Sequence, residues 1–513
     1  MTLYPDNPTV FRPGIENYQT GFSVNWSKIG LFALIGFIVA LLSDVPGTAG
    51  PIFIGARAVL LLLLVISLFL PARIAIPLFF ILLVGGVDSV QTSSAKSTEG
   101  LQTVAGLWKF QVSIIRPSWF VAACILIQML KVMPIHINKV TKHAIVWFAT
   151  VPVITSIMYG APYTIARSIE IPQDLRFAVV LVANIILFYN FFRKYPESIN
   201  IMLAVLVGCF LSRYACDTIY WFVGRGATIA GLNRVSVDSA KSCVIFNLLF
   251  AIWLIVKHKK IVLGTVLGLS SCLLLMVYAT RLNWVTAVLA CAILLVLFGA
   301  KRLLIVFPIF LIIVFGSIKL IAVFSPETTL ALSETAGEFS FEQTNTNYLV
   351  KLDPLRYGEI VNSLNTTAKR LAFVWGNGYG SYYTDEVFAF PSSLVDAHPV
   401  YSEKTGEFYW LHNFPFQMLF KHGIIGAVII FGLWILPARK FYKYFDRTDK
   451  SLYGGIMLCL LAFILPAMIN LWWSGKGLFI NGFIIGLFMA LADFYEHQYV
   501  NTEMEQSGEA FVL

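Results

Sequence analysis

A histidine stands at the end of the longest polar segment in this chain. Residues 325–412 interrupt a sequence that is otherwise dominated by apolar stretches, and they close on Leu411-His412-Asn413. A free imidazole titrates near neutral pH and can accept a proton from a hydroxyl group. A lone histidine is more often structural. Its place where the chain returns to apolar sequence nevertheless predicts that His412 is a general base, with Asn413 beside it.

Arginines supply a second kind of candidate site. A planar guanidinium can bind phosphate oxygens bidentately, and ionisable groups near apolar spans often mark functional sites. The arginines concerned lie at the ends of apolar stretches or inside the polar segment; they are Arg213, Arg225, Arg234, Arg281, Arg356 and Arg370. Snorkelling to a membrane surface, or pairing with nearby carboxylates, would explain any single one of them. As a set they predict an anionic ligand.

The polar segment is also rich in aromatic residues, which form a usual surface for sugars when they stand beside carboxylates. We expect Tyr379, Tyr382 and Tyr383 to contact a sugar, together with Asn413. The alternative is that the aromatic residues form a small core of the segment itself, or an interfacial belt. The motif Gly376-Asn377-Gly378-Tyr379-Gly380, which includes the first of these tyrosines, predicts a tight turn that presents backbone N–H groups. The spacing of its glycines differs from that of a dinucleotide-binding fingerprint.

The composition is that of a membrane protein. Of 513 residues, 58% are hydrophobic and 13% are charged, against about 25% charged in a soluble domain; the mean hydropathy is +0.77. We predict an all-α polytopic fold of about fourteen transmembrane helices. Their approximate centres are 27–43, 51–70, 74–87, 113–130, 143–159, 177–192, 199–211, 237–256, 261–279, 283–300, 303–324, 423–437, 453–472 and 477–493. The first apolar run reads as a retained span rather than a cleavable signal peptide.

Loop charge predicts the orientation of these spans, because cytoplasmic loops are enriched in lysine and arginine. The basic clusters fall on alternate loops; they are Arg73, Lys131 with Lys139 and Lys142, Arg193-Lys194, Lys257 to Lys260, Lys301-Arg302, and Arg439 to Lys450. Both termini should therefore be cytoplasmic. Residues 325–412, with eleven acidic and five basic residues, should be extracytoplasmic. The chain's net charge of +9 is mostly loop charge, so we expect no nucleic-acid partner.

Four parts follow from this pattern. Residues 1–324 hold the first eleven spans, and 325–412 form one large extracytoplasmic loop. Residues 413–493 hold an interfacial helix, with His412 at its outer N-terminal end, and the last three spans; 494–513 form a cytoplasmic tail. The seven cysteines, none of which lies in 325–412, argue against a disulfide framework or a cysteine metal site.

Together these features resemble the O-antigen ligase-like superfamily, which includes WaaL ligases and Wzy-type polysaccharide polymerases. The resemblance covers about residues 210–440 and rests on the order of several motifs. The matching residues are Thr280-Arg281 at the start of a span, Arg356, Arg370, Gly376 to Gly380, His412-Asn413 and Gly423 to Gly426. Ten residues separate Arg213 from Gly224, similar to the arginine-and-glycine motif of Wzy loops, whereas nine separate Arg370 from Gly380.

The resemblance implies a glycosyltransferase of the multi-span GT-C type. Its donor would be a glycan on undecaprenyl pyrophosphate, used on the extracytoplasmic side of the bacterial cytoplasmic membrane. The pyrophosphate would be bound by Arg213, Arg281 and Arg356, with Arg225 and Arg370 in reserve. His412 would take the acceptor proton in an inverting displacement. We expect no metal and no other cofactor. The expected partners are membrane lipids and a chain-length regulator or flippase protein.

Three alternatives remain open at this level. A ligase would move the glycan to lipid A–core or another acceptor, although the number of spans and the Arg213–Gly224 spacing favour a polymerase. A transporter or flippase for lipid-linked sugars would also have many spans, but such folds often carry an internal repeat, and none is evident. A GT-C enzyme could instead use a carboxylate base in its first outer loop, where Asp44 stands alone.

Overall fold

The structure is a computed structural model of the whole chain. It describes the following residues: 22–43, 51–85, 89–90, 103–104, 117–159, 165–222, 227–229, 232–234, 240–277, 281–299, 354–390, 406–409, 411, 414–446, 449–470 and 475–506. The predicted span 303–324 and all of residues 325–353 and 391–405 therefore lie outside the described residues.

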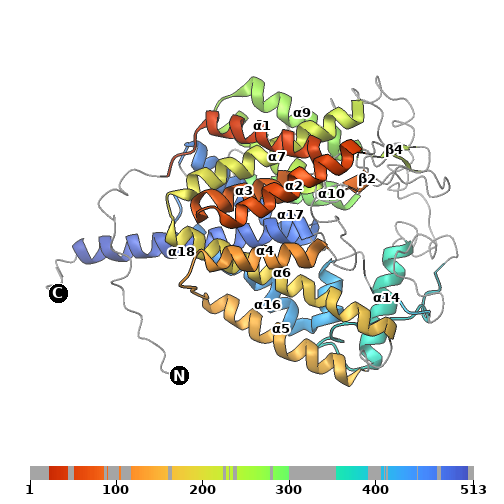
Figure 1. Cartoon of the computed structure of the whole chain (residues 1–513). Helices are drawn as coiled ribbons and strands as arrows, with labels where there is room; N and C mark the ends of the chain where they lie inside the picture. The colour runs from red at the N-terminus through yellow and green to blue at the C-terminus, as the bar shows by residue number, and fades with distance from the viewer. Residues whose placement is uncertain are drawn as a thin grey trace.

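Helices account for nearly all of the described chain (Figure 1). They are α1 (Trp26–Ser43), α2 (Pro51–Phe69), α3 (Ala72–Gly85), α4 (Pro117–Leu130), α5 (Lys139–Met158), α6 (Ile165–Lys194), α7 (Ser198–Phe222), α8 (Ala240–Val256), α9 (Ile261–Val277), α10 (Arg281–Phe298), α14 (Pro354–Lys369), α16 (Phe414–Tyr444), α17 (Leu452–Asn470) and α18 (Gly475–Gln506). Two short antiparallel hairpins join β1 (Ser89–Val90) to β2 (Thr103–Val104), and β3 (Ala227–Ile229) to β4 (Leu232–Arg234).

Six of these helices are long and apolar enough to cross a membrane, and seven shorter ones are apolar. A span needs about 20 apolar residues to cover the hydrocarbon core. Thirteen of the fourteen predicted spans coincide with these helices, and the fourteenth is the one outside the described residues. The all-helical architecture therefore fits a multi-pass membrane protein.

Helices α6 and α18 form the centre of the bundle. They pack along one another, and α18 also packs against α16. The α18 span is 89% buried, whereas the α5 span is only 39% buried, which places α5 at the edge. Close approach depends on a small residue, because a Cβ atom at Gly482 of α18 would lie 2.3 Å from the Cβ of Asn184 in α6.

The basic loops meet at one end of this bundle. Lys131 Nζ donates to the carbonyl of Leu70 at 2.8 Å. Lys194 Nζ donates to the carbonyl of Met133 at 2.9 Å. The turns after α2, α4 and α6 are therefore neighbours, although they are far apart in the sequence.

The same end includes the C-terminal helices. The hydroxyl of Tyr189 in α6 donates to Asp493 Oδ2 in α18 at 2.7 Å and accepts from Arg193 Nη1 at 3.2 Å. Lys440 of α16 pairs with the other oxygen of Asp493 at 2.9 Å. These contacts join the basic cluster after α6 to the one at the end of α16.

The start of α1 belongs to this end as well. The ring of Phe22 contacts that of Tyr495 in α18, and Trp26 contacts His258 in the turn after α8. Five of the six basic clusters therefore share one end, which is the grouping that the alternate-loop charge pattern predicts. The sixth, Lys301-Arg302, lies outside the described residues.

The opposite end of the bundle carries α14 and the polar residues that follow it, and α18 extends away from this end (Figure 1). Described residues 354–390, 406–409 and 411 form a cap here, which we call the cap throughout. Helix α14 packs against α16. The cap is the described part of the predicted large loop.

Three helices differ from their predicted boundaries. Helix α7 continues to Phe222, past the predicted end at 211, so Arg213 lies inside a buried helix and not in an outer loop. The predicted interfacial helix and the span 423–437 belong to one element, α16, which is broken at Gly423 (φ 67°, ψ −174°). Helix α18 continues through Gln506, so most of the predicted tail is helical.

The two-ended arrangement predicts opposite membrane sides for Lys260, in the turn before α9, and Val387, in the cap. All seven native cysteines are buried, which gives a low labelling background. We expect Val387→Cys to react with a membrane-impermeant maleimide in right-side-out vesicles, and Lys260→Cys to react only after detergent is added. Equal reaction of both variants in intact vesicles would contradict the arrangement.

Candidate functional site

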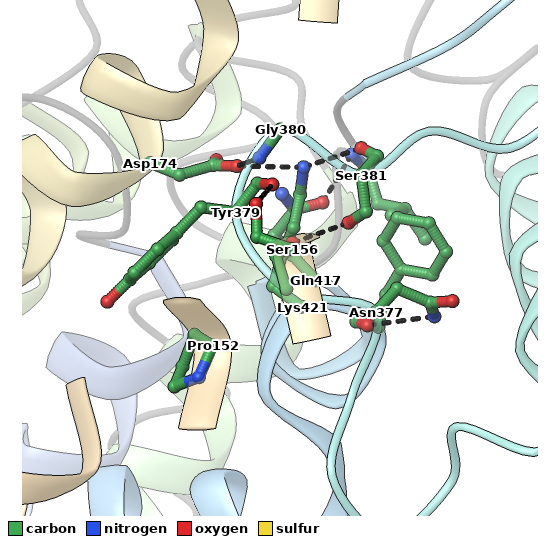
Figure 2. A network of polar contacts seen from close by, with 12 residues as sticks. Pro152, Ser156, Asp174, Asn377, Tyr379, Gly380, Ser381, Gln417 and Lys421 are labelled. Atoms are coloured by element: carbon green, nitrogen blue, oxygen red, sulfur yellow. Dashed lines mark hydrogen bonds and ion pairs between the residues drawn. The ribbon is translucent and has the colours of Figure 1, made fainter. Parts of the chain in front are cut away.

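A buried ion pair between two helices of the bundle lies where the cap meets them. Lys421 of α16 lies with its Nζ 2.9 Å from Asp174 Oδ2 of α6, and the two side chains are only 1% and 3% exposed. Two further bonds come from the cap. Lys421 Nζ donates to the carbonyl of Ser381 at 2.7 Å, and the N–H of Gly380 donates to Asp174 Oδ2 at 2.7 Å (Figure 2). A buried charge pair needs such added hydrogen bonds to offset its desolvation.

The glycine-rich motif forms the predicted tight turn. Gly376, Gly378 and Gly380 all have positive φ, between 67° and 83°, a region that favours glycine. The N–H groups of the motif donate to protein oxygens; in chain order the acceptors are Ala372, Phe420, Lys421, Pro152 and Asp174. These donors are thus used inside the protein, and the turn does not present them to a ligand. It anchors the cap.

The turn and the break in α16 interlock. A Cβ at Gly423 would lie 2.3 Å from the carbonyl oxygen of Val374, and one at Gly376 would lie 2.4 Å from the carbonyl oxygen of Lys421. On the other side, a Cβ at Gly378 would lie 2.4 Å from the backbone nitrogen of Ser156 in α5. The turn therefore fits between α5 and the broken helix only because these positions carry no side chain.

Tyr379 and Tyr383, two of the predicted sugar-binding residues, are buried. The carbonyl of Tyr379 accepts from Ser156 Oγ at 2.6 Å, and its hydroxyl donates to the carbonyl of Phe148 at 3.0 Å. Burial, with the nearby Asp174 charge, raises the pKa of Tyr379, and burial also raises the pKa of Tyr383. Both are neutral structural groups here, with exposed fractions of 1% and 0%.

A small aromatic core holds the cap together, which is the alternative that the sequence left open. Its buried members are Tyr383, Phe390, Phe408, Leu411 and Phe420. The backbones of Tyr383 and Phe408 exchange two 2.9 Å hydrogen bonds, and their rings stack at 5.5 Å. This core includes Phe420, the neighbour of Lys421 in the chain. The core of the cap therefore lies directly beside the buried ion pair.

Arg370 is held at the junction between cap and bundle. It follows α14 directly, and its Nη1 donates to Asn377 Oδ1 at 3.3 Å. Its guanidinium carbon lies 4.8 Å from the ring centre of Tyr382 and 5.7 Å from that of Tyr159 at the end of α5. The Tyr159 hydroxyl donates to the Arg370 carbonyl at 2.9 Å. Arg370 and Tyr382 are both half-buried, so they are the predicted ligand-binding pair that the structure brings together.

The other predicted arginines lie in different parts of the fold. Arg356 is a half-buried residue of α14. Arg213 is fully buried in α7, which packs against α1, α3 and α8. It lies fifteen residues after the start of α7, about 22 Å along the helix axis. Arg281 is the first residue of α10, and its side chain lies outside what the structure describes.

Three predicted site residues, His412, Asn413 and Arg225, lie outside the described residues. Both neighbours of the His412-Asn413 pair are placed, however. The N–H of Leu411 donates to Gln417 Oε1 at 2.8 Å, and α16 begins at Phe414. The chain thus enters the broken helix directly beside the cap core.

Asp174, Lys421 and Ser156 are site residues that the sequence reasoning missed. The sequence did offer a signal for Asp174 and Lys421, because each is a charged residue next to an apolar run. Charged residues near spans are usually paired and often functional. In the part of the chain that the structure describes, no group of three His, Cys, Asp or Glu side chains could hold a metal ion.

Comparisons with known proteins do not name a family: no protein-family model matches the chain, and no curated protein does so either. The candidate site must therefore be interpreted from its own residues.

The fit of the turn predicts unequal effects of two glycine substitutions. Gly378→Ala and Gly406→Ala both place a side chain at positive φ, but nothing lies within 4 Å of a Cβ at Gly406. We expect Gly406→Ala to cost about 1–2 kcal/mol of stability, and Gly378→Ala to cost more than about 4 kcal/mol because it also meets backbone atoms of α5. Thermal unfolding in detergent measures both, and equal losses would contradict the interlocked turn.

Proposed function

We propose that this protein is a membrane glycosyltransferase that joins oligosaccharide repeats carried on undecaprenyl pyrophosphate. The proposal places it in the bacterial cytoplasmic membrane, with a GT-C-like bundle and its reaction at the extracytoplasmic end. The product would be a surface polysaccharide. The resemblance in motif order motivates this function, and the geometry around Arg370 is the observation that supports it most.

Arg370 is suited to bind a phosphate group at the membrane surface. It lies between two tyrosine rings, with Asn377 fixing one edge of the guanidinium. A guanidinium held in this way loses little conformational freedom on binding, and its planar fork matches phosphate oxygens. The junction also lies at the end of the bundle opposite the basic loops, which is the extracytoplasmic end if positive loops face the cytoplasm.

The reaction proposed for this junction is a single displacement. The acceptor hydroxyl oxygen forms a bond to the anomeric carbon, and the bond from that carbon to the phosphate oxygen breaks. The lipid pyrophosphate leaves with the electron pair, and His412 takes the hydroxyl proton. Negative charge grows on the departing phosphate, so a preorganised arginine there stabilises the transition state more than the ground state. The configuration of the anomeric carbon inverts.

The remaining assigned residues have narrower roles. Tyr382 would cover one face of a sugar ring, since it is the half-buried one of the three predicted sugar-binding tyrosines, and Asn413 would bind a hydroxyl group. Arg356, in the same cap, would bind the pyrophosphate with Arg370. Arg213 and Arg281 would do so only if the lipid carrier also reached helices α7 and α10, and Arg225 would serve in reserve.

The acceptor separates the alternatives. A polymerase uses a second lipid-linked repeat, whereas a ligase uses lipid A–core or another acceptor. A transporter would move the lipid-linked sugar without breaking its bond to phosphate. The folded, anchored cap favours an enzyme over a transporter, because holding donor and acceptor in one orientation is itself a large part of catalysis.

A purified-enzyme assay in detergent tests the proposal. With labelled lipid-linked repeat as donor and acceptor, we expect wild-type protein to form longer lipid-linked glycans. His412→Ala should lower kcat by about 10²–10⁴-fold, the range for a lost general base. Arg370→Lys should lower kcat more than it changes the KM for the donor, because it keeps the charge but loses the fork that binds the departing phosphate.

Two controls accompany these variants. His136→Ala removes a histidine at the opposite end of the bundle, and Lys369→Ala removes a cation next to Arg370 that pairs with Glu386 at the exposed surface. Both should keep wild-type kinetics. The base assignment is wrong if His412→Ala retains the wild-type rate. Transfer only to lipid A–core would identify a ligase, and no transfer in detergent to either acceptor would contradict the enzyme.

A further inference from the structure

A groove of about 570 Å³ runs along α5, from its first turn to Val151, one residue before the part of α5 that contacts the cap. It lies between α5 and α16, and its apolar wall includes Val146, Val151 and Ile429. Trp147 forms its floor, because Gly426 of α16 leaves room for the indole: a Cβ there would lie 2.5 Å from Trp147 Nε1. Large apolar side chains next to the groove are exposed, which fits a surface that faces lipid tails.

One end of the groove lies at the end of the bundle where the basic loops meet, and we call it the basic end. Lys139, Lys142 and His143 line it, in the first turns of α5, and all three side chains are exposed. No ion pair or side-chain hydrogen bond joins either lysine to another residue within the described ranges. Two cations thus stand over an apolar channel without a carboxylate partner.

The length of the groove matches one leaflet. From Lys139 to Val151 the α5 axis rises by about 18 Å, and half of the hydrocarbon core is about 15 Å. An acyl chain can therefore lie along the apolar wall while its headgroup remains at the level of the lysines.

We propose that this groove binds one anionic phospholipid of the leaflet at the basic end of the protein. The phosphate is held by Lys139 and Lys142, with His143 beside them, and one acyl chain lies against Val146, Val151 and Ile429. Charge complementarity carries the choice of an anionic headgroup, since juxtamembrane basic clusters attract anionic lipids. The proposal does not rest on the glycosyl transfer proposed above.

Native mass spectrometry of the purified full-length protein tests the site, with phosphatidylglycerol or phosphatidylcholine of matched chains added in detergent. We expect phosphatidylglycerol to bind more tightly. Lys139→Ala combined with Lys142→Ala should weaken its binding by about fivefold for each lysine removed. Thr150→Trp fills the groove without changing the charge, and it should weaken binding as well.

Lys28→Ala combined with Lys260→Ala is the matched control, because it removes two exposed lysines at the same end that do not line the groove. It should leave phosphatidylglycerol binding within about twofold of the wild type, since the lost charges lie away from the groove. Three results would each overturn the site: equal binding of the two lipids, an equal loss in the control, or no loss in Thr150→Trp. Unchanged glycosyl transfer in these variants leaves the proposed enzyme intact.

Discussion

The buried ion pair between Lys421 and Asp174 is the interaction on which the arrangement of the cap depends. Two charges taken out of water each lose several kcal/mol of hydration, and here the loss is offset by bonds from Gly380 and Ser381 of the cap. The dependence is mutual. If the glycine-rich turn were displaced, Asp174 and Lys421 would remain paired but would lose their hydrogen bonds to Gly380 and Ser381. The turn and the ion pair therefore stabilise one another.

The two ends of the molecule differ in how their polar groups are used. At the cap end, backbone donors are used internally, a small aromatic core forms, and Arg370 is presented between Tyr159 and Tyr382. At the other end, lysine and arginine side chains cap helix termini and form a polar belt through Asp493. The fixed arginine is suited to stabilise the pyrophosphate leaving group of the proposed transfer. The exposed lysines beside an apolar groove are suited to bind the headgroup of a phospholipid that is not consumed.

The sequence predicted the span pattern well because long apolar runs are a strong local signal, and thirteen of the predicted spans are helices. It predicted the turn at Gly376 to Gly380 but not its role, because four of the five acceptors of its N–H groups come from α5, α6 and α16. Asp174 and Lys421 could not be paired from sequence, since they come together only because α6 and α16 both pack against α5 and α18. Arg213 was placed in a loop because its charge ends an apolar run, whereas α7 continues and buries it.

The central claim, that the buried pair holds the cap on the bundle, is tested most directly by a double-mutant cycle in detergent-solubilised protein. Asp174→Asn, Lys421→Met and the combined variant would be compared by SDS-induced unfolding. Removing one partner should cost about 3–5 kcal/mol because it leaves a buried charge unpaired, and the combined variant should cost clearly less than the sum of the two. Additive losses, or losses below about 0.5 kcal/mol, the size of an ordinary surface substitution, would contradict the account.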